Sequence, residues 1–412
     1  MAASIITGGA DMAVRYKIKF PTFESYQASS AVEIEGWGLR VRNDKRHFVS
    51  IEIDPQRMGL GPGPEPKMKM LEKEYGATIV EDFQYDLESH LFKPEMQGPD
   101  DSSYPSVDDV VSMIRAKDAW QLRGRNKVVL AVVDTGINGL MVPPARRIGS
   151  WQPLGDEEAW KDYWGHGTMC ACIAAGTADL ATFEGVAPNI GLISCRTKFY
   201  DSELSAIYDY LTELKKKLKV PMVATNSFGV NTGSPPAAPP DSDFIPALNE
   251  AVAAGIMVCF SGGNYHAFAG GKPEECQPTS IWLYKCLSNL LTVATCKLDR
   301  TMWSYSSRGP GQKFGQPGCS RKPDVTAPTP VNGRVVYGDK VVSMADGWGT
   351  SGACPQVAAL AVLLLEINPN LTRDELFNII RSTADPLGFM PECEGSGLIN
   401  CLAAVRAVKD KV

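Results

Sequence analysis

Residues 349–365 read G-T-S-G-A-C-P-Q-V-A-A-L-A-V-L-L-L, a glycine-containing turn followed by an apolar run. The glycines on either side of Ser351 allow a sharp turn, and the residues from Pro355 onward are apolar nearly all round, which predicts a helix buried on every side. A hydroxyl at the entrance of such a helix lies where backbone N–H groups and the positive end of the helix dipole converge. Ser351 is therefore a candidate nucleophile, although a serine in this place is also an ordinary helix cap.

The chain of 412 residues is long enough for one large domain with a smaller unit attached. Its apolar content of 44%, its charged content of 21% and its formal net charge of −6 indicate a globular protein directed to neither nucleic acid nor a membrane surface. No stretch is expected to span a membrane. The first residues lack the apolar segment of a secretory signal, so the expected location is intracellular, or secreted if a signal has been removed.

The eleven cysteines are an odd number, and several of them lie in apolar stretches. These are expected to be reduced cysteines of the core: Cys170, Cys172, Cys259, Cys296 and Cys354. Cys170 and Cys172 are one residue too close for the usual C-x-x-C pair of a zinc site, and the chain has four histidines. No metal site is therefore predicted.

Residues 1–92 are predicted to form a small α+β module. Apolar and basic residues alternate along residues 14–20, which is typical of a strand with one face in solvent. Further elements of this module are expected at residues 48–53 (strand), 68–75 (helix) and 77–80 (strand). Residues 93–105 are rich in proline, glycine, serine and aspartate, and they are predicted to form an exposed linker and a candidate processing region.

Residues 106–412 show a different pattern, in which short apolar strands alternate with helices. Strands are expected at residues 128–133, 191–195, 222–225, 256–260 and 291–294, and helices at 202–218, 244–254 and 372–382. This alternation predicts a three-layer α/β/α sandwich around a mostly parallel sheet. Functional residues are then expected at the carboxyl ends of the strands.

Three polar residues lie where expected strands end or helices begin. Asp134 follows an apolar strand in D-T-G-I-N, His166 lies between glycines in G-H-G-T, and Asn264 ends the motif S-G-G-N. Each alone has an ordinary structural explanation, as a turn residue, a buried histidine or a loop residue. Together with Ser351, however, Asp134 and His166 supply an orienting carboxylate, a general base and a nucleophile.

The order Asp, His, Ser and the motifs around these residues resemble the subtilisin-like serine proteases, the subtilases, from about residue 104 to the C-terminus. The resemblance implies a serine endopeptidase that works through an acyl enzyme, with Ser351 as nucleophile, His166 as base and Asp134 as orienting group. It also implies an oxyanion hole made by Asn264 and the backbone N–H of Ser351. No cofactor is expected; structural calcium is common in the family, but no contiguous carboxylate loop marks a site.

The resemblance extends to the substrate and to the first module. The residues expected to contact substrate are Ser227, Phe228, Gly229, Ser261, Gly262 and Gly263. A polypeptide substrate would pair with the first three as an added strand. Gly262 and Gly263 favour a bulky apolar substrate side chain, whereas Glu274 and Glu275, if they fold over the pocket wall, favour a basic one, and the sequence leaves both open. The first module is similar to the family's inhibitory propeptide, which implies a zymogen that processes itself and is inhibited by its own propeptide.

Some of these motifs also occur in function classes other than the endopeptidases. An α/β-hydrolase is excluded because no histidine follows Ser351, as the order of that triad requires. A transpeptidase or macrocyclase would use the same acyl enzyme and exclude water, with residues 265–290 as a lid. A catalytically silent scaffold would keep the fold and bind peptides, and these last two alternatives remain open.

Overall fold

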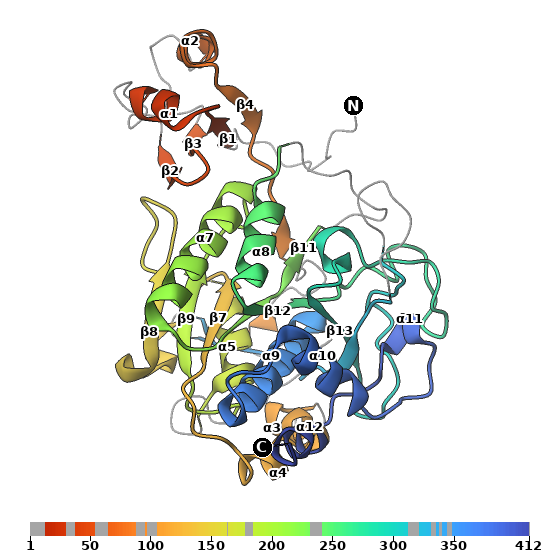
Figure 1. The fold of residues 1–412 in the computed structure, drawn as a ribbon. Helices are drawn as coiled ribbons and strands as arrows, with labels where there is room; N and C mark the ends of the chain where they lie inside the picture. Colours follow the sequence, from red (N-terminus) through yellow and green to blue (C-terminus); the bar gives the residue numbers. More distant parts are fainter. Residues whose placement is uncertain are drawn as a thin grey trace.

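The computed structural model describes residues 13–29, 38–53, 65–87, 95–96, 105–162, 164–177, 184–230, 241–311, 321–330, 335–337, 340–343 and 348–411. Its centre is a seven-stranded sheet in the order β14-β13-β12-β10-β7-β9-β8, in which every neighbouring pair is parallel (Figure 1). The strands are β7 (Val129–Asp134), β8 (Arg147–Trp151), β9 (Gly191–Arg196), β10 (Met222–Asn226), β12 (Ile256–Ser261), β13 (Leu291–Cys296) and β14 (Val325–Pro328). The predicted α/β/α sandwich is confirmed.

Helices cover both faces of this sheet because the strands are apolar on both sides. Along β7, Leu130 and Val132 belong to the core cluster shared with α5 and α9, whereas Ala131 and Val133 belong to the cluster shared with α7 and α8. The helices are α3 (Val107–Met113), α4 (Ala116–Trp120), α5 (His166–Ala175), α7 (Asp201–Leu218), α8 (Phe244–Ala253), α9 (Gly349–Ile367), α10 (Arg373–Ser382), α11 (Pro391–Glu394) and α12 (Cys401–Lys409), with short 3₁₀ turns η2 (Gly139–Met141), η3 (Pro144–Arg146) and η4 (Leu283–Cys286).

Helix α9 begins earlier than the sequence suggested. The prediction was a turn followed by a helix from Pro355, but the helix begins at Gly349 and Pro355 lies inside it. Proline has no N–H to donate to the carbonyl four residues before it, which here is that of Ser351. The thiol of Cys170 on α5 lies 3.6 Å from this carbonyl oxygen and donates to it instead.

The same helix bears on the expectation that no stretch spans a membrane. Within the part of the chain that the structure describes, α9 is the helix that is long and apolar enough to cross a membrane by length and composition. However, 94% of that window is buried inside the protein. Its apolar surface is accounted for by the core of the sandwich, where it packs against β10, β12 and β13.

The N-terminal module is a four-stranded antiparallel sheet in the order β2-β3-β1-β4 with two helices, and it lies against α7 and α8 at the top of Figure 1. Its elements are β1 (Val14–Lys19), α1 (Phe23–Ser29), β2 (Leu39–Asn43), β3 (Phe48–Ile53), α2 (Glu65–Tyr75) and β4 (Thr78–Glu81). The module has a small core of its own that includes Ile18 and Ile51. The predicted strands and helix of this region are present.

The basic face of β1 is not in solvent, contrary to the prediction. Arg15 and Lys17 are each only 2% exposed because this face is covered by the start of α7. Arg15 forms an ion pair with Glu203, and the Nζ of Lys17 lies 2.9 Å from Asp201 Oδ1. The partners lie more than 180 residues away in the sequence, so the alternating pattern could indicate the strand but not what covers it.

A short segment connects the module to the carboxyl-terminal edge of the central sheet. β5 (Asp86–Leu87) pairs antiparallel with β11 (Phe228–Gly229), the strand predicted to bind substrate. Further on, β6 (Glu95–Met96) pairs with β16 (Lys340–Ser343), which pairs with β15 (Val335–Tyr337). Apart from residues 95–96 and 105, the predicted linker and processing region lies outside the described residues.

Candidate active site

Asp134 and His166 meet at the carboxyl end of β7. Asp134 is the last residue of β7, His166 is the first residue of α5, and the distance from His166 Nδ1 to Asp134 Oδ1 is 2.7 Å. The close approach depends on Gly167, because a Cβ there would lie 2.1 Å from Gly136 O and 2.9 Å from Asp134 Cβ. Steric hindrance therefore explains why a glycine follows the histidine in the sequence.

The charge of Asp134 changes the proton affinity of His166. Burial lowers the pKa of the imidazole, but the charge and the hydrogen bond of Asp134 more than offset this effect. The net result is a pKa of His166 above its usual value. The pair is therefore arranged to stabilise an imidazolium, as a general base requires.

Asp162 is a buried carboxylate that the sequence analysis missed. Its Oδ2 accepts from the N–H of Thr168 at 2.8 Å and its Oδ1 from the N–H of Gly165 at 2.9 Å, so it holds the first turn of α5. A carboxylate at a helix N-terminus is favoured by the helix dipole. The signal was available, since an acidic residue four positions before a candidate base is an obvious positioning group for the helix that carries it.

Ser351 lies in the first turn of α9, next to α5. Its Oγ and the Nε2 of His166 are both buried, and neither forms a hydrogen bond with any residue in the described ranges. The distances from Cys170 show that the three predicted residues lie close together. Its Sγ lies within 4.8 Å of the nearest side-chain ligand atoms of Asp134 and His166, and 3.6 Å from Ser351 O. Hydrogen bonds of catalytic groups are often long before substrate binds.

Asp134, His166 and Cys170 are also the group of potential metal ligands that the described part of the chain brings together. They coincide with the candidate catalytic residues, and Nδ1 of His166 is already hydrogen-bonded to Asp134. The thiol of Cys170 is protonated at neutral pH, because burial raises its pKa well above the usual value. This grouping therefore offers no separate metal site.

Asn264 follows β12 and contacts the start of α9. Its Oδ1 accepts from the N–H of Thr350 at 2.9 Å, and a Cβ at Gly349 would lie 2.4 Å from its Nδ2. Gly349 also has a positive φ of 61°, so both the backbone angle and the side-chain amide demand glycine. The amide donor of Asn264 is thus held beside the first turn of α9, where backbone N–H groups lack an acceptor within the helix.

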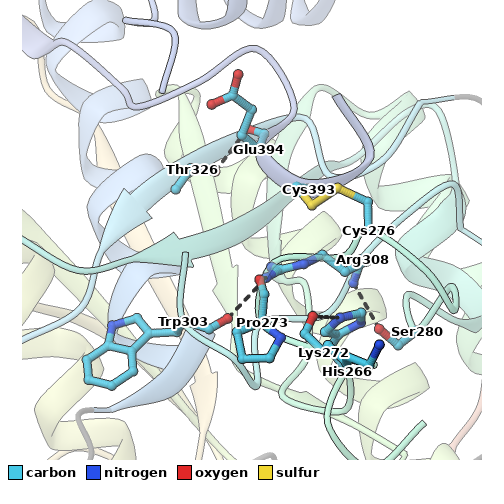
Figure 2. Close-up of a disulfide and its surroundings, with 10 residues drawn as sticks. All are labelled: His266, Lys272, Pro273, Cys276, Ser280, Trp303, Arg308, Thr326, Cys393 and Glu394. Atoms are coloured by element: carbon cyan, nitrogen blue, oxygen red, sulfur yellow. Dashed lines mark hydrogen bonds between the residues drawn. A yellow bond between two sulfur atoms is a disulfide. The ribbon is translucent and has the colours of Figure 1, made fainter. Parts of the chain in front are cut away.

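The segment of residues 265–290 is attached to the body of the domain at several points (Figure 2). Cys276 forms a disulfide with Cys393 of α11, and the N–H of Arg308 donates to Ser280 Oγ at 2.9 Å. This pairing was not predicted, because the two cysteines are 117 residues apart. The other cysteines in the described ranges are free and buried, as expected for most of them.

The residues predicted to contact substrate lie at the carboxyl ends of β10 and β12, which are neighbours in the sheet. Gly229 and Gly262 border the same small cavity of about 10 Å³. Lys285 of η4 borders it too and was missed by the sequence analysis. Glu274 and Glu275 are exposed instead of folded over a pocket wall, and Glu275 pairs with Lys272 at 2.9 Å.

Comparison with known proteins identifies the family. The model of the subtilase family matches residues 125–398. The chain is 28% identical over 305 residues to the intracellular serine protease of Paenibacillus polymyxa, covering 70% of this chain and 83% of that protein. It is 28% identical over 279 residues to subtilisin BL of Lederbergia lenta, covering 68% and 91%.

A solved structure supports the same fold. Fervidolysin from Fervidobacterium pennivorans, a keratinolytic enzyme related to subtilisin, superimposes with a TM-score of 0.63 at 16% identity. The superposition covers 97% of this chain and 62% of fervidolysin. The family match covers more than half of the chain and includes the Asp134, His166 and Ser351 motifs. The chain therefore belongs to the subtilase family, the subtilisin-like serine endopeptidases.

Proposed function

We propose that the protein hydrolyses peptide bonds through an acyl enzyme formed on Ser351. His166 Nε2 takes the proton of Ser351 Oγ as the oxygen attacks the carbonyl carbon, and it then gives this proton to the leaving amine. A water molecule then attacks the acyl enzyme in the same way, with His166 again as the base, and the acid product is released. Asp134 holds the imidazole and stabilises its cation, while Asn264 Nδ2 and the N–H of Ser351 donate to the oxyanion.

The observation that carries this proposal is the contact of 2.7 Å between His166 Nδ1 and Asp134 Oδ1. It leaves Nε2 as the nitrogen that can act on Ser351, on the neighbouring helix. The raised pKa of His166 supports the role of base, and the amide of Asn264 beside the first turn of α9 supports the oxyanion hole.

The substrate is proposed to be an extended polypeptide. β11 has one partner among the described strands, the two-residue β5, and the pairing shows that an extended segment fits along Phe228 and Gly229. Main-chain hydrogen bonds of this kind bind an extended chain without regard to its sequence. Flexible or unfolded polypeptides would meet this requirement.

Labelling with a fluorophosphonate probe tests the proposal. A serine with an activated hydroxyl should be labelled, and mass spectrometry of the peptic fragments should locate the probe on Ser351. Product masses from a peptide substrate then separate the alternatives: hydrolysis adds one water, whereas a transpeptidase or macrocyclase gives a joined or cyclic product without it. Absence of labelling would favour the silent scaffold and contradict the proposal.

Replacing Asn264 with alanine should lower kcat by about 10²–10³ with little change in KM, because the amide donates to a charge that exists only in the transition state. Steady-state kinetics on one peptide substrate measures both constants. The matched control is Asn289→Ala, a half-buried amide whose Nδ2 donates to Asn249 Oδ1. An effect confined to KM would mean that Asn264 binds the ground state of the substrate.

The pH profile should report the Asp134–His166 pair. The base must be neutral, so kcat/KM should rise with pH through an apparent pKa above 6.5, the ordinary value of histidine. In Asp134→Asn, burial still lowers the pKa of His166 while the larger of the two charges that raise it is gone and the smaller one, of Asp162, remains, so the acidic limb should move to lower pH. The rate should also fall by about 10⁴. An acidic limb at the same pH in both proteins would exclude His166 as the titrating base.

A further inference from the structure

A lysine is buried beside the strand proposed to bind substrate. Lys285 lies in η4, is 3% exposed, and borders the small cavity shared by Gly229 and Gly262. Lysine is among the residues least often buried in proteins, and the proposed mechanism gives Lys285 no role. We propose that Lys285 selects substrates with an acidic side chain, glutamate above all, at the residue whose carbonyl Ser351 attacks. This inference rests on the proposed function and names its substrate class.

The register of β5 on β11 locates that residue. Asp86 lies opposite Gly229 and Leu87 lies opposite Phe228, so a polypeptide continued by one residue would place that residue opposite Ser227. Ser227 Oγ lies 3.7 Å from Cys170 Sγ, which also lies 3.6 Å from Ser351 O. The position opposite Ser227 is therefore the one beside the nucleophile.

The cavity lies next to the strand along which that residue would lie. Two of the residues that border the cavity are glycines, Gly229 on the substrate strand and Gly262 after β12, so no side chain from either closes the path. The remaining wall is largely aromatic: Tyr265 stacks on Trp282 with ring centroids 5.5 Å apart, and the hydroxyl of Tyr284 donates to Phe228 O at 3.1 Å. Lys285 contributes the basic group of this lining.

The chemistry of such a pocket favours a carboxylate. Burial lowers the pKa of Lys285 well below its usual value, and the group on the catalytic helix that interacts with it, Cys354, is a neutral thiol because burial raises its pKa to about 11. An entering carboxylate would stabilise the ammonium form through a charge-assisted hydrogen bond in a site with little water. The flexible four-carbon stem of lysine allows its ammonium group to adjust to the incoming acid.

Other side chains are disfavoured for stated reasons. A basic side chain would find no negative charge from Lys285 to offset its own burial, and a neutral one of the same shape would lack the charge-assisted bond. The disulfide Cys276–Cys393 and the contact of Ser280 with Arg308 hold the segment that carries Lys285 in place (Figure 2). In the chain's own sequence the residue after Leu87 is Glu88, which lies outside the described residues and is acidic as the inference requires.

Four peptides that differ only in the residue before the cleaved bond test the inference: Glu, Gln, Phe and Lys. For the wild-type enzyme, kcat/KM for Glu should exceed that for Gln by about 10- to 100-fold, the scale of a hydrogen bond to a charged group, and Lys should be cleaved slowest. In Lys285→Met, which keeps the length and removes the charge, the Glu-to-Gln ratio should fall to about one. Lys272→Met, an exposed lysine on the same segment, should keep the wild-type ratio.

The outcomes separate this inference from the proposed function. If wild-type enzyme is labelled on Ser351 by the fluorophosphonate but prefers Phe or Lys, the acidic preference is wrong and the mechanism stands. If wild-type enzyme is not labelled, the proposed function itself fails. A Lys285→Met enzyme that still prefers Glu would overturn the role of Lys285, and if this variant does not fold, the wild-type preference alone decides.

Discussion

Replacing Ser351 with alanine should abolish peptide hydrolysis while the fold persists. The expected loss in kcat is about 10⁶-fold, the scale known for removal of the nucleophile from a subtilisin-type triad. Stability should hardly change, because Ser351 Oγ is buried and makes no hydrogen bond within the described part of the chain. Its removal therefore leaves no buried donor or acceptor unsatisfied. Initial rates on a peptide substrate and a thermal melt measure the two effects.

The matched control is a second buried serine remote from the site. Ser205 on α7 is buried and donates to Ser202 O within its own helix, so Ser205→Ala should keep wild-type activity. Activity close to wild type in Ser351→Ala would exclude Ser351 as the nucleophile. Loss of activity together with a large drop in melting temperature would instead indicate that the substitution unfolds the protein.

Much of the fold was predictable because the central strands are apolar on both faces. β7, β9, β10, β12 and β13 lie within two residues of their predicted bounds. β8 was missed because it is an edge strand, R-I-G-S-W, without an apolar run, and its residues are half-buried or exposed. β14 was not predicted as a strand, since V-T-A-P is too short for a periodic signal.

The site was predictable as far as its residues lie in motifs. Asp134 and His166, 32 residues apart in the sequence, are in contact, and the sequence had placed them at a strand end and a helix start. Lys285 and Cys276 lie in no motif, and their surroundings are assembled from β11, β12 and α11 only in the folded chain. A local sequence pattern carries no information about such contacts between distant segments.

The second large effect concerns the N-terminal module. We expect wild-type protein to cut itself into two fragments that separate between residues 86 and 103, whereas Ser351→Ala should remain one chain. The pairing of β5 with β11 supports this, because the chain leaving the module already lies along the proposed substrate strand. The first cut would be intramolecular and favoured by effective concentration. Gel electrophoresis and intact mass measure it.

Ion pairs indicate how the released module would inhibit. Lys17 is buried against α7, its Nζ 2.9 Å from Asp201 Oδ1 and 3.3 Å from Asp243 Oδ2. Burial lowers the pKa of Lys17, but these carboxylates more than offset it, so its pKa is raised and the ammonium is charged at neutral pH. Removing one partner leaves buried carboxylates without their cation, which costs about 3–5 kcal/mol.

A module added back to the mature enzyme should therefore inhibit, and the Lys17→Ala module should inhibit about 10²- to 10³-fold more weakly. Lys69→Ala is the matched control, because this lysine is exposed on α2, the helix at the top of Figure 1. Inhibition constants for the three modules measure the effect.

Equal processing of wild type and Ser351→Ala in a protease-free preparation would show that another protease makes the cut. Full activity of uncut wild type would show that the covalently attached module does not block the site. The ion pairs of Lys17 would then hold the module in place without covering Ser351.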